Sequence, residues 1–196
     1  GVANAGAEAR RLDTEGRRKT HIVTSVIEHA SVLDVFRELE KSGVSVSYIP
    51  VNENGIVKID ELKKALRPET ILVSIMYVNN EIGTVQPISE IANYLRDFRN
   101  QQSKTFPIFH TDASQAPAYL DVNVQKLGVD LLTLDAQKIY GPKGVGLLYK
   151  KRGMMLKPLL FGGRQEFGIR PGTENVPGIV GFAKAMEISN KLKVIS

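Results

Sequence analysis

The 196-residue sequence contains no cysteine and no tryptophan. The lack of cysteine excludes disulfides, thiolate metal sites and a cysteine nucleophile within this stretch. No apolar run approaches the roughly 20 residues that a membrane-spanning helix needs. What remains, with 42% hydrophobic and 24% charged residues, is the composition of an ordinary soluble globular protein. We therefore expect one folded domain that binds neither a metal nor a membrane.

The charge of the chain is modest, at +5, and its basic residues are mostly scattered. A local excess lies at Arg10, Arg11, Arg17, Arg18 and Lys19, with no aromatic side chains between them for base stacking. A solvated helix face is the expected role of this cluster, and we expect no nucleic-acid binding. The sequence starts at Gly1 without an initiator methionine or a signal-peptide pattern, so we expect a fragment.

Hydrophobic periodicity predicts helices that alternate with short buried strands. The expected strands are 21–25, 44–51, 70–77, 107–111, 131–134 and 145–149. The expected helices are 2–18, 31–42 with a stop at Gly43, 60–66 with Asp60 as its cap, one from Pro87 or Ser89 to about Arg99, and one starting near Val176. This alternation predicts an α/β fold with a mainly parallel sheet flanked by helices. Ligands of such sheets bind beyond the carboxyl ends of the strands.

Polar residues follow four of the predicted strands at the ends where such a site lies. They are Glu28-His29, Asn79 to Gly83, Thr111 to Gln115, and Asp135 to Lys138. Pyridoxal phosphate (PLP) needs a lysine amine for its aldehyde, a carboxylate for its ring nitrogen, a neutral donor for its phenolic oxygen and a stacking partner. The chain offers, in that order, Lys138, Asp112, Gln115 or Asn80, and His29.

Each of these residues also has a structural interpretation. Lys143 and Lys150 are alternative lysines, His29 could cap a helix, and Asp112 could be a turn residue. Asn79 could replace Asn80 as the cofactor contact. His21 and His110 lie in or at the ends of predicted strands, where a structural role is expected.

Five motifs occur in an order that resembles a known family. They are Ile27 to Leu33, Val73 to Gln86, His110 to Gln115, Lys138 to Gly146, and Gly162 to Asn175. Together they resemble the cysteine desulfurases, which are class V aminotransferases among the fold-type-I PLP enzymes, and the resemblance covers about residues 1–190. It implies that the chain is the PLP-binding large domain, residues 1–196, without the upstream segment and the C-terminal small domain.

The resemblance also implies a role for each site residue. Lys138 holds the cofactor and is a plausible proton shuttle, and His29 stacks on the ring, which makes these two the catalytic candidates. Asp112 pairs with the ring nitrogen. The remaining implied contacts are Asn80 and Gln115 at the phenolic oxygen, and Thr173 at the phosphate of a neighbouring subunit in a homodimer.

The sequence departs from the family pattern directly before Lys138. Asp135 and Gln137 stand where the family has a phosphate-binding serine and a histidine, so they are cofactor-binding candidates with altered chemistry. A carboxylate about 4 Å from the phosphate is repelled by on the order of 4 kcal/mol per unit charge at an effective dielectric of about 20. Asp135 must therefore turn away, take up a proton or pair with a cation.

By the resemblance, the intact enzyme removes sulfur from L-cysteine, leaving alanine and a persulfide on a cysteine. The sulfur then passes to a scaffold partner for iron–sulfur cluster or thio-cofactor assembly, and the family suggests a cytoplasmic protein. Since this chain has no cysteine, we expect it to be inactive alone. The alternatives are a selenocysteine lyase or another class V aminotransferase, and a degenerate domain that only dimerises.

Overall fold

The computed structural model describes residues 20–193, so the predicted helix at 2–18 and its basic cluster lie outside the described residues. The strands, in chain order, are β1 (His21–Ser25), β2 (Ser45–Ile49), β3 (Thr70–Ser74), β4 (Ile108–Asp112), β5 (Leu131–Asp135) and β6 (Gly146–Lys150). They form one six-stranded sheet in the order β2-β1-β3-β4-β5-β6. The first five are parallel, and β6 pairs antiparallel with β5. The predicted α/β fold with a mainly parallel sheet is confirmed.

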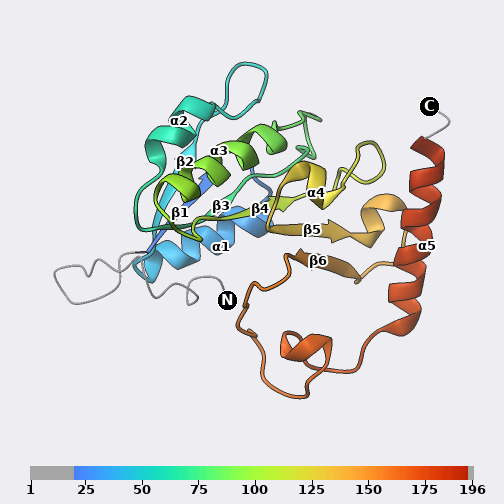
Figure 1. Ribbon diagram of the computed structural model, residues 1–196. Coiled ribbons are helices and arrows are strands. Elements are labelled where there is room, and N and C mark those ends of the chain that lie inside the picture. The colour runs from blue at the N-terminus through green and yellow to red at the C-terminus, as the bar shows by residue number, and fades with distance from the viewer. Residues whose placement is uncertain (1–19, 194–196) are drawn as a thin grey trace.

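Helices cover both faces of this sheet (Figure 1). One face carries α2 (Ile59–Ala65), α3 (Ile88–Gln101) and α4 (Val124–Leu127), and the other carries α1 (Ala30–Lys41). The larger core lies under α2 and α3, where Leu62, Ile91 and Leu95 are fully buried. A smaller core joins Phe36 of α1 to Ile22 and Ile71. Cover on both faces explains the nearly continuous apolar run of the central strand β3.

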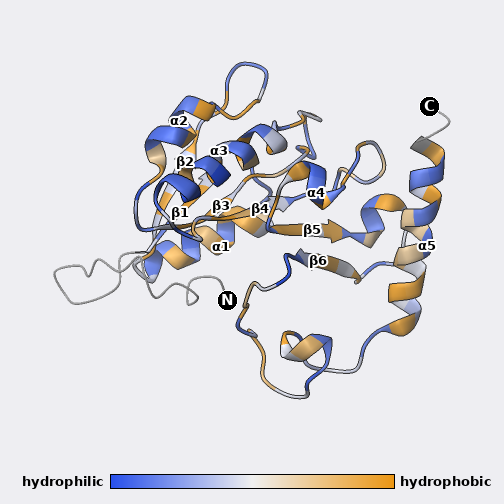
Figure 2. Cartoon of the chain, in the orientation of Figure 1, coloured by the Kyte–Doolittle hydropathy of each residue, from blue (hydrophilic) through white to orange (hydrophobic). Residues whose placement is uncertain are grey.

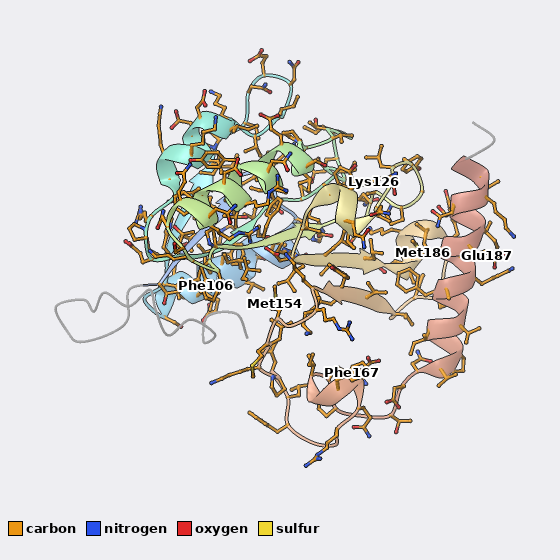
Figure 3. The ribbon with its side chains drawn as sticks, in the orientation of Figure 1. Phe106, Lys126, Met154, Phe167, Met186 and Glu187 are labelled. Carbon is orange, nitrogen blue, oxygen red and sulfur yellow. The ribbon has the colours of Figure 1, made fainter. Side chains whose placement is uncertain are left out.

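The last third of the chain departs from this layered arrangement. A short 3-10 helix, η2 (Ala136–Ile139), follows β5, and a second one, η3 (Glu166–Gly168), lies in the long segment between β6 and α5 (Val176–Lys193). Helix α5 packs against η2 at the carboxyl end of β5. Figure 3 places Met186 on the side of α5 that faces η2 and Glu187 on the other side. Helix α5 therefore borders the sheet edge that carries the candidate site.

Two local predictions need correction, and one short helix was missed. The predicted strand 70–77 ends at Ser74, although the Ile75 and Tyr77 amides still donate to the β4 carbonyls of His110 and Asp112. Lys58, rather than Asp60, is the N-cap residue of α2. Asp60 lies in the first turn, where its charge suits the positive end of the helix dipole. The four-residue helix α4 was not predicted, because one turn shows no periodicity.

Candidate active site

The carboxyl ends of β1, β3, β4 and β5 lie at one edge of the sheet, since these strands are parallel neighbours. His29 follows β1, and Asn80 follows β3. Asp112 ends β4, and Gln115 comes three residues later. Lys138 follows β5 and lies within η2. The sheet topology thus brings these five predicted residues to the same edge. Thr173 does not follow a strand of the sheet directly; it is exposed in the segment between η3 and α5.

Asp112 is half-buried and held firmly through one of its two oxygens. Its Oδ1 accepts hydrogen bonds from the Ser114 amide at 3.0 Å and from the Ser114 hydroxyl at 2.6 Å. A third, longer bond of 3.4 Å comes from the hydroxyl of Thr133 on β5. Asp112 is therefore a turn residue, which was the structural interpretation of the sequence. It is also an oriented carboxylate suited to a protonated ring nitrogen.

His110 lies on the same sheet face as Asp112, two residues earlier on β4. Its Nδ1 is 2.8 Å from the Ser74 hydroxyl, and its Nε2 is 3.4 Å from the Thr133 hydroxyl. Burial lowers the pKa of His110 to about 4, although the negative charge of Asp112 opposes this shift. His110 is therefore neutral near pH 7 and has the structural role that the sequence predicted.

His29 is exposed and is the N-cap residue of α1. Its Nδ1 accepts from the Ser31 amide at 3.2 Å and lies 2.9 Å from the Ser31 hydroxyl. The capping role therefore coexists with an imidazole ring that is open to a ligand. Because Nδ1 accepts the amide bond, the proton of the neutral ring is on Nε2.

Asn79 and Asn80 have opposite environments. Asn79 is buried, its Nδ2 donates to the Ile27 carbonyl, and its Oδ1 accepts from two amides of its own turn, whereas Asn80 is exposed. Of the two, Asn80 is the side chain that can reach a ligand. Gln115 is half-buried in the turn after β4.

Asp135 and Gln137 bind each other. The Gln137 amide donates to Asp135 Oδ1 at 3.1 Å, and the Gln137 side-chain Nε2 donates to Oδ2 at 2.9 Å. The sequence raised pairing with a cation as one possibility for Asp135. In the part of the chain that the structure describes, neutral donors of Gln137 take that place instead. Lys138 comes next in the chain and is exposed.

The donor set fits most of PLP. It supplies an exposed amine, an oriented carboxylate, an exposed imidazole and two neutral amides at one edge, and these answer the needs of the aldehyde, the ring nitrogen, the ring face and the phenolic oxygen. The position that fits poorly is Asp135, whose charge opposes a phosphate dianion. Among residues 20–193, no group of three or more histidine and carboxylate side chains could hold a metal ion, and no helix is long and apolar enough to cross a membrane.

Sequence reasoning gave no role to Glu28, Ser114 or Thr133. Glu28 is 5% exposed, and burial raises its pKa to about 7, with the charge of nearby Asp112 adding to the shift. Its position directly before His29, in a polar pair after a strand, was the available signal. The contacts of Ser114 and Thr133 depend on strand pairing, which the sequence alone does not give.

Comparisons with known proteins match nearly the whole chain. Residues 6–195 match the family described as aminotransferase class-V. The cysteine desulfurase IscS of Dictyoglomus turgidum is 49% identical over 91% of this chain and 43% of its own length. The cysteine desulfurase IscS of Methanosarcina thermophila is 50% identical over 86% of this chain and 40% of its own length.

Solved structures give the same result. A NifS-like protein aligns with a TM-score of 0.82 at 44% identity, over 89% of this chain and 46% of that one. SspA, solved in complex with cysteine, aligns with a TM-score of 0.78 at 42% identity, over 86% of this chain and 47% of that one. The chain thus spans somewhat less than half the length of the relatives that it matches.

Proposed function

Since the chain belongs to the aminotransferase class-V family, we propose that it is the PLP-binding part of a cysteine desulfurase. Class V aminotransferases and cysteine desulfurases are PLP-dependent enzymes. The observation that carries the proposal is the sheet edge itself. There Asp112, with Oδ1 fixed by Ser114, ends β4, and Lys138 follows the neighbouring strand β5.

The residues of this chain divide the work of holding the cofactor. When bound, PLP supplies an electron sink for negative charge that develops next to the substrate amine. Lys138, which is exposed, would hold the cofactor through its aldehyde, and its amine would move protons next to the substrate. Asp112 keeps the ring nitrogen protonated, His29 covers the ring face, and Asn80 and Gln115 donate to the phenolic oxygen.

The whole enzyme, on this proposal, converts L-cysteine and an enzyme thiol into alanine and an enzyme persulfide. The thiol must lie outside these 196 residues, because they contain no cysteine. The persulfide sulfur then goes to a scaffold protein for iron–sulfur cluster assembly in the cytoplasm. The relatives named above are cysteine desulfurases, which favours this activity over a selenocysteine lyase.

We propose that the intact protein is a homodimer in which Thr173 reaches the phosphate in the partner subunit. Support comes from large apolar side chains that are exposed around this residue. Leu159, Phe161 and Phe167 are 84%, 89% and 99% exposed, and Val176 and Val180 of α5 are also exposed. Figure 2 shows this apolar character in the segment after β6 and along α5, and Figure 3 places Phe167 at η3. Apolar surface of this kind marks an interface, which sedimentation of the intact protein tests.

The direct test of cofactor binding is a titration of the purified chain with PLP. We expect a visible absorbance band from the bound cofactor, and we expect Lys138→Ala to abolish it. Lys143→Ala is the matched control, since Lys143 is a nearby exposed lysine after the same strand, and it should keep the band. An unchanged band in Lys138→Ala, or its loss in Lys143→Ala alone, would contradict the assignment.

A further inference from the structure

Glu28 links the segment after β1 to the segment after β3. Its side chain is buried. Oε1 accepts one hydrogen bond from the Ser25 hydroxyl at 2.6 Å and another from the Met76 amide at 2.8 Å. Glu28 thus reaches from the loop that carries His29 to the backbone that leads into the loop of Asn80.

Asn79 makes the return connection. It is also buried, and its Nδ2 donates to the carbonyl of Ile27 at 2.9 Å. Its Oδ1 accepts from the amides of Glu81 and Ile82 at 2.9 and 3.0 Å, which shapes the turn that follows. One side chain therefore builds the loop of Asn80 and ties it to the loop of His29.

Glu28 and Asn79 together form a reciprocal clasp, since each side chain bonds the backbone of the segment that carries the other. Each of them directly precedes an exposed candidate cofactor contact, His29 in one case and Asn80 in the other. We propose that Glu28 and Asn79 are positioning residues, whose clasp sets the placement of His29 and Asn80 at PLP. This inference rests on the proposed function.

The charge of Glu28 guides the choice of variants. Its Oε2 is buried without a hydrogen-bond partner among the described residues. Burial raises the pKa of Glu28 to about 7, because an unpaired charge away from water is costly. The groups that face it are the Ser25 hydroxyl, the Met76 amide and the negative charge of Asp112. Glutamine has the same shape without the charge, and its oxygen can accept both hydrogen bonds.

The first experiment measures PLP affinity by absorbance at pH 7. Glu28→Met and Asn79→Ala each cut the clasp, and each should weaken binding on the order of tenfold, the value of one or two hydrogen bonds. Glu28→Gln, which keeps both hydrogen bonds, should bind PLP with wild-type affinity. The double variant should lose less than the product of the single losses, because either substitution already opens the clasp.

Asn52→Ala is the matched control for Asn79→Ala. Asn52 Oδ1 also accepts two backbone amides, of Asn54 and Ile56 at 3.0 and 2.9 Å, in the turn between β2 and α2, which carries none of the candidate cofactor contacts. Its removal should lower stability but leave PLP affinity unchanged. If Asn79→Ala prevents folding, Asn79→Asp replaces it, since aspartate keeps the acceptor but cannot donate to Ile27.

A second measurement, amide hydrogen exchange without PLP, separates failure of the clasp from failure of the proposed function. Glu28→Met should speed exchange at Met76 and also at Glu81 and Ile82, which Glu28 does not bond. Acceleration at Met76 alone would overturn the clasp, whether or not the chain binds PLP. Wild-type affinity in both cutting variants would overturn the positioning role, whereas no PLP binding by wild type would refute the proposed function.

Discussion

Asp135 and Gln137 are the residues at which the sequence departs from the family pattern directly before Lys138. Both oxygens of Asp135 are bound by Gln137, so neutral donors orient the carboxylate next to the η2 turn. Charge at this position opposes a phosphate dianion, although exposure to solvent and salt reduces the repulsion.

Asp135→Asn therefore tests whether this charge limits cofactor affinity. Asparagine keeps an oxygen that can accept the Gln137 amide, and it removes one negative charge. We expect PLP to bind about tenfold more tightly, which is well below the repulsion of two unscreened charges. Pyridoxal, which lacks the phosphate, is the control ligand and should bind with unchanged affinity. An equal change for both ligands would show that Asp135 acts by shape and not by charge.

Three buried titratable residues give the folding stability a defined pH dependence. Burial lowers the pKa values of His21 and His110 from 6.5 to about 4, and it raises that of Glu28 from 4.5 to about 7. The two histidines contribute stability that is complete above pH 6.5 and is lost as the pH falls toward 4. Glu28 acts in the opposite sense, with a contribution that is complete below pH 4.5 and is lost as the pH rises through 7.

Between pH 4.5 and 6.5 the unfolded chain thus binds about two more protons at the histidines and one fewer at Glu28. These three residues make stability rise with pH by roughly 1.4 kcal/mol per unit. Glu28→Gln removes the group whose titration opposes that of the histidines. The rise of stability with pH in this window should therefore become steeper by roughly 1.4 kcal/mol per pH unit. Urea unfolding of both proteins at several pH values measures the difference, and equal slopes would contradict the assigned burial of Glu28.

Residue roles were predictable from sequence where local chemistry determines them. The positions of His29 and Asp112 after strands indicated their turn roles, which the structure shows, whereas their contacts with PLP stay predictions. The buried bonds of Glu28, Asn79 and Thr133 were not predictable, because they join segments about 20 to 50 residues apart that only the sheet brings together.

At the scale of elements, η2 depends on close contact with α5. A Cβ on Gly181 of α5 would lie 2.6 Å from Pro142 Cγ, and one on Gly141 would lie 3.2 Å from the Cβ of Ala185 on α5. These glycines let the helix approach the turn that follows Lys138. The position of η2, and of Lys138 within it, therefore depends on having glycine, which has no side chain, at this contact.

Gly181→Ala tests this packing. On an open helix surface the change stabilises by about 1 kcal/mol, but overpacking costs about 1–3 kcal/mol, so we expect a net loss of stability in urea unfolding. Ala183→Gly, at an exposed position of the same helix, gives the propensity effect alone. If Gly181→Ala raises the free energy of unfolding by as much as Ala183→Gly lowers it, the result contradicts the close contact between α5 and Pro142.

The strands were the most predictable elements. All six were found within three residues of their ends, because apolar runs between turn residues are typical of a sheet covered on both faces. The antiparallel direction of β6 was not predicted. That direction depends on the short turn from Tyr140 to Gly144, which returns the chain beside β5.

At the scale of the whole molecule, one edge of a parallel sheet collects the chemistry, and the segment after β6 carries exposed apolar surface. The sequence predicted the first feature, since parallel strands place their carboxyl ends together. It did not predict the second, because exposure depends on what packs against each side chain. The proposed activity of the intact enzyme needs both this edge and residues that the 196-residue chain does not contain.

Covalent capture of the cofactor tests the central claim most directly. The chain is incubated with PLP and reduced with borohydride, which fixes the cofactor on the lysine that holds it, and the modified peptide is identified by mass spectrometry. We predict modification at Lys138, with little at Lys143 or Lys150. Label spread evenly over exposed lysines, or concentrated at another lysine, would contradict the site described above.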